Sequence, residues 1–219
     1  MIINSISVKP YLYELLNPLE TNSINHYKRH SWIIKITDAD GFVGFGEASP
    51  LSGINYETFN ESGYALEGFR LAIKGITDNI DNDEMMILAE AHTINTPSAA
   101  FAIHTAIYDL LSQKNNLSLS QYLNSNSINK LKINGIHGLT QLDHYTTIKV
   151  KCGFRNLYDE IEFLEQISNQ YNSNIKLIID LNQAYDLSKA IRFFKEIDHF
   201  NIAYVEQPLN KNNIDDTAE

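Results

Sequence analysis

Three short segments near the beginning of the chain have strand-like patterns of apolar residues. Residues 6–15 alternate loosely, residues 32–36 are mostly apolar and β-branched, and residues 42–47 follow the turn-forming sequence at 38–41. A period of two is typical of strands, and an Asp-Ala-Asp-Gly sequence is typical of a turn. The pattern therefore predicts three strands, the last two of them joined by a tight turn.

Apolar residues then change to helical spacing. Three stretches show it: 56–76, 84–91 and 97–112. Pro97 stands where a first helical turn tolerates proline. Three strands followed by three helices predict an α+β module at residues 1–125. The Ser- and Asn-rich stretch 124–129 indicates a boundary, and a second module at 126–219 follows it.

Strand-like and helix-like stretches alternate in the second module. The strand-like stretches are 131–136, 147–151, 175–180 and 202–206, and the helix-like ones are 156–171 and 187–197. Between Gly138 and Thr147 the chain is too short for a full helix. Such alternation predicts parallel β/α units. A closed (β/α)₈ barrel takes typically about 250 residues, so we expect only the first half of a barrel here, with four strands.

Composition and charge exclude several classes of partner. Hydrophobic residues make up 43% and charged residues 20% of the chain, as is ordinary for a globular protein. The net charge of -10 argues against a nucleic-acid partner, and the chain lacks the run of about 18 apolar residues that a membrane span needs. The single cysteine, Cys152, allows no internal disulfide. We therefore expect a reducing compartment, either the cytoplasm or, for an organelle-encoded chain, the plastid stroma.

Three charged residues lie at the carboxyl ends of the predicted barrel strands. Lys151, Asp180 and Glu206 end successive strands, each one β/α unit after the last. In a parallel barrel the ends of neighbouring strands meet at one rim, where barrel enzymes have their active sites. Two carboxylates at this rim suit Mg²⁺, and a lysine beside a bound cation can act as a base because burial and the cation lower its pKa.

Each of these residues alone also has an ordinary structural interpretation. A lysine in a strand is usually solvated, Asp180 could cap the following turn, and Glu206 could belong to a loop. Lys149 and Lys151, however, lie on the same side of the pleat. Since the outer side of a barrel strand is covered by helices, we expect both lysines to face the barrel interior. His137, just after the first barrel strand, points toward the same rim and could line a substrate pocket.

Four segments resemble motifs of the muconate-lactonizing branch of the enolase superfamily. Residues 149–151 resemble its Lys-x-Lys motif on the second barrel strand, and residues 180–182 resemble its Asp-x-Asn metal motif on the third. Residues 205–208 resemble its Glu-x-Pro metal motif on the fourth. Residues 44–51 are similar to the Gly-x-Gly-Glu-x-x-Pro-Leu segment of its N-terminal capping domain. The resemblance is collinear and extends over essentially the whole chain.

The resemblance implies a Mg²⁺ cofactor, or another divalent cation, and a small-molecule carboxylate as substrate. Asp180 and Glu206 would hold the metal, which would bind the substrate carboxylate. Lys151 would remove the α-proton, with Lys149 close by as a second cation that helps to keep Lys151 neutral. Further residues are assigned to substrate binding: Asn182, His137 and Ser52.

Within the branch, residues 50–53, 57–58 and 97–101 look most like o-succinylbenzoate synthases of menaquinone or phylloquinone biosynthesis. This resemblance implies a hydro-lyase that abstracts a proton and then eliminates water. Dipeptide epimerases and N-acylamino-acid racemases share the same catalytic framework and are the alternative. The family's third metal carboxylate and second catalytic lysine belong to later strands. We therefore also consider an inactive fragment, a homo-oligomer, or a complementing C-terminal barrel half.

Overall fold

The computed structural model describes residues 1–20, 25–51, 57–76, 78–138, 144–171, 175–212 and 215. The chain forms two compact units, residues 1–129 and 130–219. Within the described ranges, no helix has the length and apolar character needed to cross a membrane.

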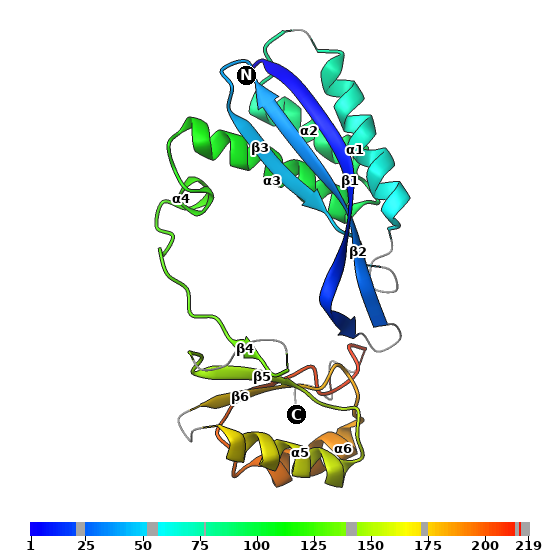
Figure 1. Ribbon diagram of the computed structural model, residues 1–219, viewed down its shortest axis with the longest axis vertical. Coiled ribbons are helices and arrows are strands. Elements are labelled where there is room, and N and C mark those ends of the chain that lie inside the picture. The colour runs from blue at the N-terminus through cyan, green and yellow to red at the C-terminus, as the bar shows by residue number, and fades with distance from the viewer. Residues whose placement is uncertain are drawn as a thin grey trace. The chain divides into compact units, whose positions relative to one another are not determined.

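The first unit is a three-stranded antiparallel sheet with helices packed against one of its faces (Figure 1). The strands follow one another in the order β1 (Ile3–Glu20), β2 (Asn25–Asp38) and β3 (Val43–Ala48). The helices are α1 (Phe59–Lys74), α2 (Asn82–His92), α3 (Pro97–Lys114) and the short α4 (Leu119–Leu123). The three predicted strands and three predicted helices are present, whereas α4 was not predicted.

Helix α3 lies unusually close to strand β3 because two glycines of the strand face it. A Cβ atom added to Gly44 would lie 1.9 Å from the carbonyl oxygen of Ala106, and one added to Gly46 would lie 1.8 Å from that of Ala102. Any side chain at these positions would force the helix away from the sheet. The Gly-Phe-Gly sequence therefore sets the close packing of helix and sheet, and the fully buried Ile34 lies in the core that this packing closes.

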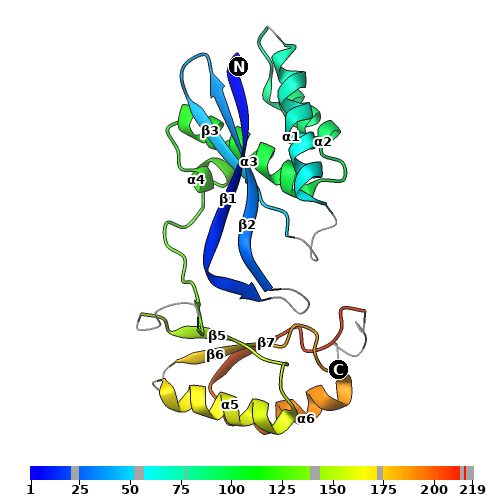
Figure 2. The same cartoon turned by 45° about the vertical axis from the view of Figure 1, so that its right-hand side comes forward.

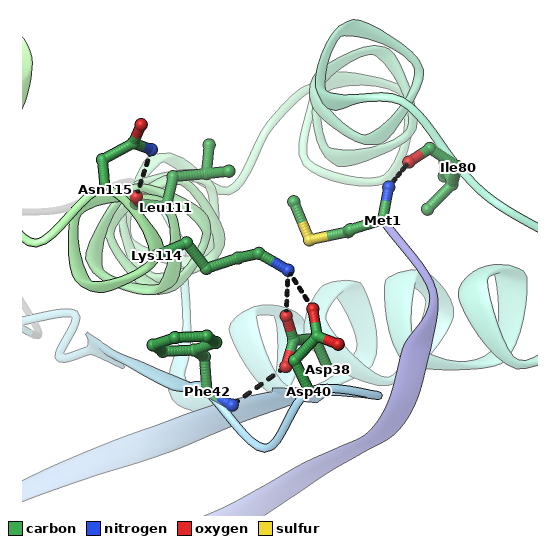
Figure 3. A network of polar contacts seen from close by, with 8 residues as sticks. All are labelled: Met1, Asp38, Asp40, Phe42, Ile80, Leu111, Lys114 and Asn115. Atoms are coloured by element: carbon green, nitrogen blue, oxygen red, sulfur yellow. Dashed lines mark hydrogen bonds and ion pairs between the residues drawn. The ribbon is translucent and has the colours of Figure 1, made fainter.

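A polar network ties the end of α3 to the turn between β2 and β3 (Figure 3). The Lys114 ammonium lies 2.5 Å from Asp38 Oδ2 and 2.8 Å from Asp40 Oδ2, and the Phe42 N–H donates to Asp38 Oδ1 at 2.9 Å. Burial of Asp38 raises its pKa, but the hydrogen bonds from Lys114 and Phe42 lower it by more, so the net pKa is below its ordinary value. The network joins two elements that are far apart in sequence.

The second unit is a parallel four-stranded sheet with both of its helices on one face (Figures 1 and 2). In sheet order the strands are β4 (Gly135–Ile136), β5 (Thr147–Lys151), β6 (Lys176–Asp180) and β7 (Ile202–Glu206). The helices α5 (Leu157–Gln170) and α6 (Leu187–Ile197) connect β5 to β6 and β6 to β7. An α+β unit followed by the first β/α units of a barrel is the predicted fold class, which is thereby confirmed.

The first barrel strand is shorter than the sequence suggests. A strand at 131–136 was expected, but β4 includes only Gly135 and Ile136, which pair with Ile148 and Lys149 of β5. The apolar residues before it are not buried: 77% of Leu131 and 67% of Ile133 is exposed. The prediction was wrong for 131–134, because a segment with a strand-like pattern becomes a strand only where a neighbouring strand pairs with it.

Strand alternation decides which residues of β5 reach the helices. Ile148 and Val150 are fully buried and belong to the same core as Leu164 of α5 and Phe193 of α6. The intervening lysines of β5 are only half-buried and lie on the opposite face. The expectation that the lysines point away from the helix layer is therefore confirmed.

Candidate active site

Lys151, Asp180 and Glu206 form one row across three neighbouring strands. Lys151 lies opposite Asp180 in the pairing of β5 with β6, and Asp180 lies opposite Glu206 in the pairing of β6 with β7. Each residue is the last of its strand. The register therefore brings one amine and two carboxylates to the carboxyl end of the sheet, the end at which barrel enzymes carry out their chemistry.

Lys149, two residues before Lys151 on the same face, bridges the two carboxylates. Its Nζ lies 2.8 Å from Asp180 Oδ2 and 2.8 Å from Glu206 Oε2. The side chain of Asp180 is 7% exposed, that of Lys149 27% and that of Glu206 38%, so the contact is partly shielded from water. Burial lowers the pKa of Lys149, but its hydrogen bonds to the two carboxylates raise it by more, and the net pKa lies above the ordinary value. Lys149 therefore carries a positive charge between two negative ones.

The two carboxylates present an arrangement that fits a partial metal site. Their oxygens converge on one cation, since both contact the same ammonium nitrogen. Mg²⁺ is commonly bound through one or two carboxylates while it retains several waters. Among the residues that the structure describes, no group of three or more His, Cys, Asp or Glu side chains could hold a metal ion. Asp180 and Glu206 therefore remain the metal ligands that the sequence motifs predict.

Asn182 lies two residues after Asp180, the last residue of β6, and orients its carboxylate. Its backbone N–H donates to Asp180 Oδ1 at 3.3 Å, on the oxygen that Lys149 does not contact. Its φ of 47° is left-handed, a conformation in which asparagine is enriched. The backbone of Asn182 therefore contributes to the site, in addition to the side chain that the sequence motif suggests.

Glu160 holds the turn that follows Lys151. Its Oε2 accepts hydrogen bonds from the Gly153 N–H at 2.9 Å and the Arg155 N–H at 3.2 Å, and its Oε1 lies 3.2 Å from the Arg155 guanidinium. The side chain is fully buried. Gly153 has a φ of 95°, and a Cβ there would lie 2.6 Å from that of Ala184 in the turn after β6. Glu160 thereby anchors the end of β5 against the neighbouring strand end.

Sequence reasoning did not identify Glu160, although a signal exists. On α5 the buried residues Glu160, Leu164 and Ile167 follow helical spacing. A glutamate on the apolar face of an amphipathic helix requires a partner in the interior, because a buried charge is costly unless it is paired or hydrogen-bonded. The position of Glu160 in that pattern could have indicated a buried anchor.

The structure does not bring His137 to the row. His137 Nδ1 lies 3.2 Å from the Tyr171 hydroxyl, and its ring packs against Phe163 of α5. Burial lowers the pKa of this histidine. These contacts lie on the helix-covered side of the sheet, opposite Lys149, so the expectation that His137 lines the pocket gains no support from the structure. Ser52 lies outside the described residues.

The fold and the row of charged residues define an enolase-type architecture, in which a capping unit precedes a β/α barrel. Two family models match the chain: "Mandelate racemase / muconate lactonizing enzyme, N-terminal domain" at residues 6–124 and "Enolase C-terminal domain-like" at residues 136–219. The chain belongs to the mandelate racemase / muconate lactonizing enzyme family of the enolase superfamily.

Several curated proteins are similar to the chain. An L-amino acid-D/L-Glu epimerase from Francisella philomiragia is 27% identical, over 90% of this chain and 58% of the relative. A hydrophobic dipeptide epimerase from Enterococcus faecalis is 30% identical, over 84% and 55% respectively. A chloromuconate cycloisomerase from Cupriavidus pinatubonensis is 24% identical, over 87% and 56%. The chain therefore spans less than two thirds of the length of these relatives.

A solved structure supports the same fold. The dipeptide epimerase from Enterococcus faecalis V583, complexed with Mg and the dipeptide L-Leu-L-Tyr, superposes with a TM-score of 0.83 at 24% sequence identity. The match covers 99% of this chain and 64% of that structure.

Proposed function

We propose that the protein abstracts the proton α to a carboxylate of a small acid, and that its substrates are dipeptides, which it epimerises. The observation that carries this proposal is the register that aligns Lys151, Asp180 and Glu206 at the carboxyl ends of adjacent strands. An amine beside two metal-binding carboxylates suits removal of a weakly acidic C–H proton, for which enolase-superfamily sites use a lysine or histidine base together with Mg²⁺.

Each residue of the row has a separate role in this proposal. Lys151 accepts the α-proton on Nζ. Inversion at the α-carbon then requires a proton from a second acid on the opposite face, a role that the family's second catalytic lysine on a later strand would fill. Asp180 and Glu206 would hold Mg²⁺, which supplies Lewis-acid stabilisation of negative charge on the substrate carboxylate. The Asn182 N–H fixes the orientation of the Asp180 carboxylate. Glu160 keeps the end of β5 in place, so that Lys151 stays opposite Asp180.

The relatives favour epimerisation over dehydration. The relatives described above are epimerases and a cycloisomerase, and the first two act on dipeptides or related amino-acid substrates by name. The o-succinylbenzoate synthase interpretation depends on residues 50–53, 57–58 and 97–101, of which 52 and 53 are outside the described residues. Both reactions begin with loss of an α-proton, and only dehydration continues with loss of a β-hydroxyl. The proposal therefore keeps the shared first step and takes dipeptides as the substrate class.

Isotope exchange tests the first step alone. Exchange of the α-proton with solvent needs only one base, so the assay does not depend on a second catalytic residue. The chain is incubated in D₂O with Mg²⁺ and L-Ala-L-Glu, and the loss of the α-proton signal is followed by NMR. We expect exchange with the wild-type chain and a loss of at least about 100-fold in Lys151→Ala, as is typical when a general base is removed.

Lys195→Ala, on the outer helix α6, is the matched control and should exchange at the wild-type rate. Equal rates for Lys151→Ala and the wild type would contradict the base assignment. The dehydratase would be favoured if the chain exchanged the α-proton of no dipeptide in a panel but formed an aromatic product from the o-succinylbenzoate precursor. No reaction with either substrate class would support the inactive fragment.

A further inference from the structure

The two edges of the sheet in the first unit differ. Strand β3 forms one edge, and side chains of α3 bind its outward-facing backbone groups. The Phe45 N–H donates to Asp109 Oδ2 at 2.9 Å. The Val43 carbonyl accepts a hydrogen bond from Gln113 Nε2 at 2.7 Å. An uncovered strand edge is a template for pairing with another chain, and natural proteins commonly cover such edges. At β3, side chains of the same unit provide this cover.

Strand β1 forms the other edge, beside α1 (Figure 1). In an antiparallel pair, the N–H and C=O groups of successive residues point alternately to the two sides of the strand. Since the Phe45 N–H points away from β2, its cross-strand partner Lys35 directs its groups to β1, where it lies opposite Ser7. The neighbouring residues Ile6 and Val8 therefore direct their groups to the outer edge. Among the residues that the structure describes, none makes a hydrogen bond to these groups.

The uncovered part of this edge is short. Pro10 is the next residue along β1 that faces outward, and proline has no N–H to donate. At the start of the chain, the Met1 carbonyl accepts a hydrogen bond from the Ile80 N–H at 2.9 Å. Between these two points, Ile6 and Val8 offer their N–H and C=O groups to an additional strand.

A groove of about 270 Å³ lies beside the uncovered edge. Residues 3–6 of β1 form one wall, in which Ile3 and Ile6 are half-buried. The end of α1 and the residues after it form the opposite wall, with the buried Ile73 and the exposed Ile76. The groove is therefore partly apolar, as is expected of a site that receives alternate side chains of an added strand.

The charged side chains of this groove are both basic. Arg70 and Lys74 line it, and no carboxylate is among its described lining residues. Arg70 is already paired with Glu67, one turn earlier, by a hydrogen bond of 2.7 Å from its Nε. Lys74 is exposed and forms no ion pair within the described part of the chain. A partly apolar groove with an unpaired ammonium at its rim is complementary to a segment that carries acidic residues beside apolar ones.

We propose that the outer edge of β1 binds an extended, acidic peptide segment of another protein by β-strand addition. The backbone of the segment pairs with Ile6 and Val8, its apolar side chains contact Ile73, and a carboxylate contacts Lys74. A second copy of this chain is less suited to the edge, because pairing β1 with β1 about a two-fold axis would place Arg70 and Lys74 of both copies at one interface. The interaction is independent of the proposed function.

Fluorescence anisotropy with a labelled peptide, Thr-Val-Thr-Val-Glu-Glu, tests the charge complementarity. Its valines share one face of the strand, and Thr-Val-Thr-Val-Lys-Lys is the matched control peptide. We expect the acidic peptide to bind and the basic peptide to bind at least about tenfold more weakly. Lys74→Glu should weaken binding of the acidic peptide at least about tenfold, whereas Lys195→Glu, the same charge change in the second unit, should change it less than about twofold.

Removal of edge N–H groups tests the strand addition. Val8→Pro deletes an outward-facing N–H that β2 does not use, and it should weaken binding of the acidic peptide at least about fivefold. Val8→Thr keeps the N–H and should bind within about twofold of the wild type. Trp32 fluorescence verifies that each variant is folded. If Val8→Pro does not fold, the same loss is expected when the wild type is titrated with the acidic peptide N-methylated at both valines.

Three results would overturn the proposal: no binding of the acidic peptide, equal binding of the acidic and basic peptides, or unchanged binding after loss of the edge N–H groups. Sedimentation equilibrium adds a further outcome. Self-association of the chain that Val8→Pro abolishes would show that a second copy occupies the edge, which would also overturn the proposal.

Discussion

At the residue scale, two lysines of this protein contact carboxylates that come from other elements. Lys149 of β5 contacts carboxylates on β6 and β7, and Lys114 of α3 contacts two carboxylates beside the end of β2. Pairs of this kind contribute to stability when they are shielded, because the Coulomb attraction grows as the local dielectric constant falls. Asp38, with 1% of its side chain exposed, is the clearest case.

The Asp38 pair predicts a pH-dependent stability of the first unit. Because the pKa of Asp38 is lower in the folded state than its ordinary value of 3.8, its contribution is fully present above that value and is lost as the pH falls through the lower, folded pKa. Asp38→Asn should destabilise the first unit at pH 6 by about 1–3 kcal/mol and should flatten the loss of stability below about pH 4.

Fluorescence of Trp32, the only tryptophan, reports this unit during urea unfolding. Asp40→Asn, which alters the more exposed partner of Lys114, is the control and should have a smaller effect. Parallel pH profiles for the wild type and Asp38→Asn would show that the folded-state pKa of Asp38 is not lowered.

The sequence was sufficient to predict that the charged residues lie on one face of the sheet, at the carboxyl ends of the strands. It did not predict which of their side chains are in contact. Strand alternation indicates that Lys149 and Lys151 share a face, and the ends of parallel strands meet at one edge. Neither rule fixes a side-chain rotamer, so the bridge from Lys149 to Asp180 and Glu206 could not be predicted. Residue-scale contacts depend on which neighbours lie within reach once the sheet is assembled.

At the element scale, the barrel segments were predicted closely and the first strand was not. Strands β5 and β7 and helix α6 have the predicted bounds. In β5 every second residue is buried, whereas the burial of β7, the last strand of the described sheet, does not alternate. The run at 131–134 also has apolar residues at alternate positions, but among the described residues no strand pairs with it, and it remains outside the sheet. A strand-like pattern in the sequence therefore predicts a strand only where the folded protein supplies a neighbouring strand that pairs with it.

The connection from α5 to the end of β5 predicts a stability effect confined to the second unit. Glu160→Ala would leave the Gly153 and Arg155 N–H groups and the Arg155 guanidinium without their acceptor, and should lower the free energy of unfolding of this unit by about 3–5 kcal/mol. Far-UV circular dichroism should show an earlier urea transition, while the Trp32 fluorescence transition should stay at the wild-type midpoint.

Glu162→Ala, on the exposed side of the same helix, serves as the control and should shift neither transition. An unchanged circular dichroism transition in Glu160→Ala would mean that the turn after Lys151 does not depend on this carboxylate.

At the scale of the whole molecule, two units contribute different parts of an enolase-type protein. The first has a glycine-mediated contact between sheet and helix, and the second presents the charged row on one face of a parallel sheet. The chain spans 58% and 55% of the length of two epimerase relatives, so the activity of the whole protein is a proposal that rests on the row itself. The proposal requires that both carboxylates, Asp180 and Glu206, contribute to proton abstraction by Lys151.

The dependence of α-proton exchange on Mg²⁺ tests this central claim most directly. The chain is treated with EDTA, dialysed and assayed in D₂O with L-Ala-L-Glu before and after Mg²⁺ is restored, alongside Asp180→Asn. The account predicts exchange that is lost after EDTA, returns with Mg²⁺ in the wild type, and does not return in Asp180→Asn because one of two carboxylate ligands is missing. Exchange that persists in EDTA, or that Mg²⁺ restores equally in both proteins, would contradict the account.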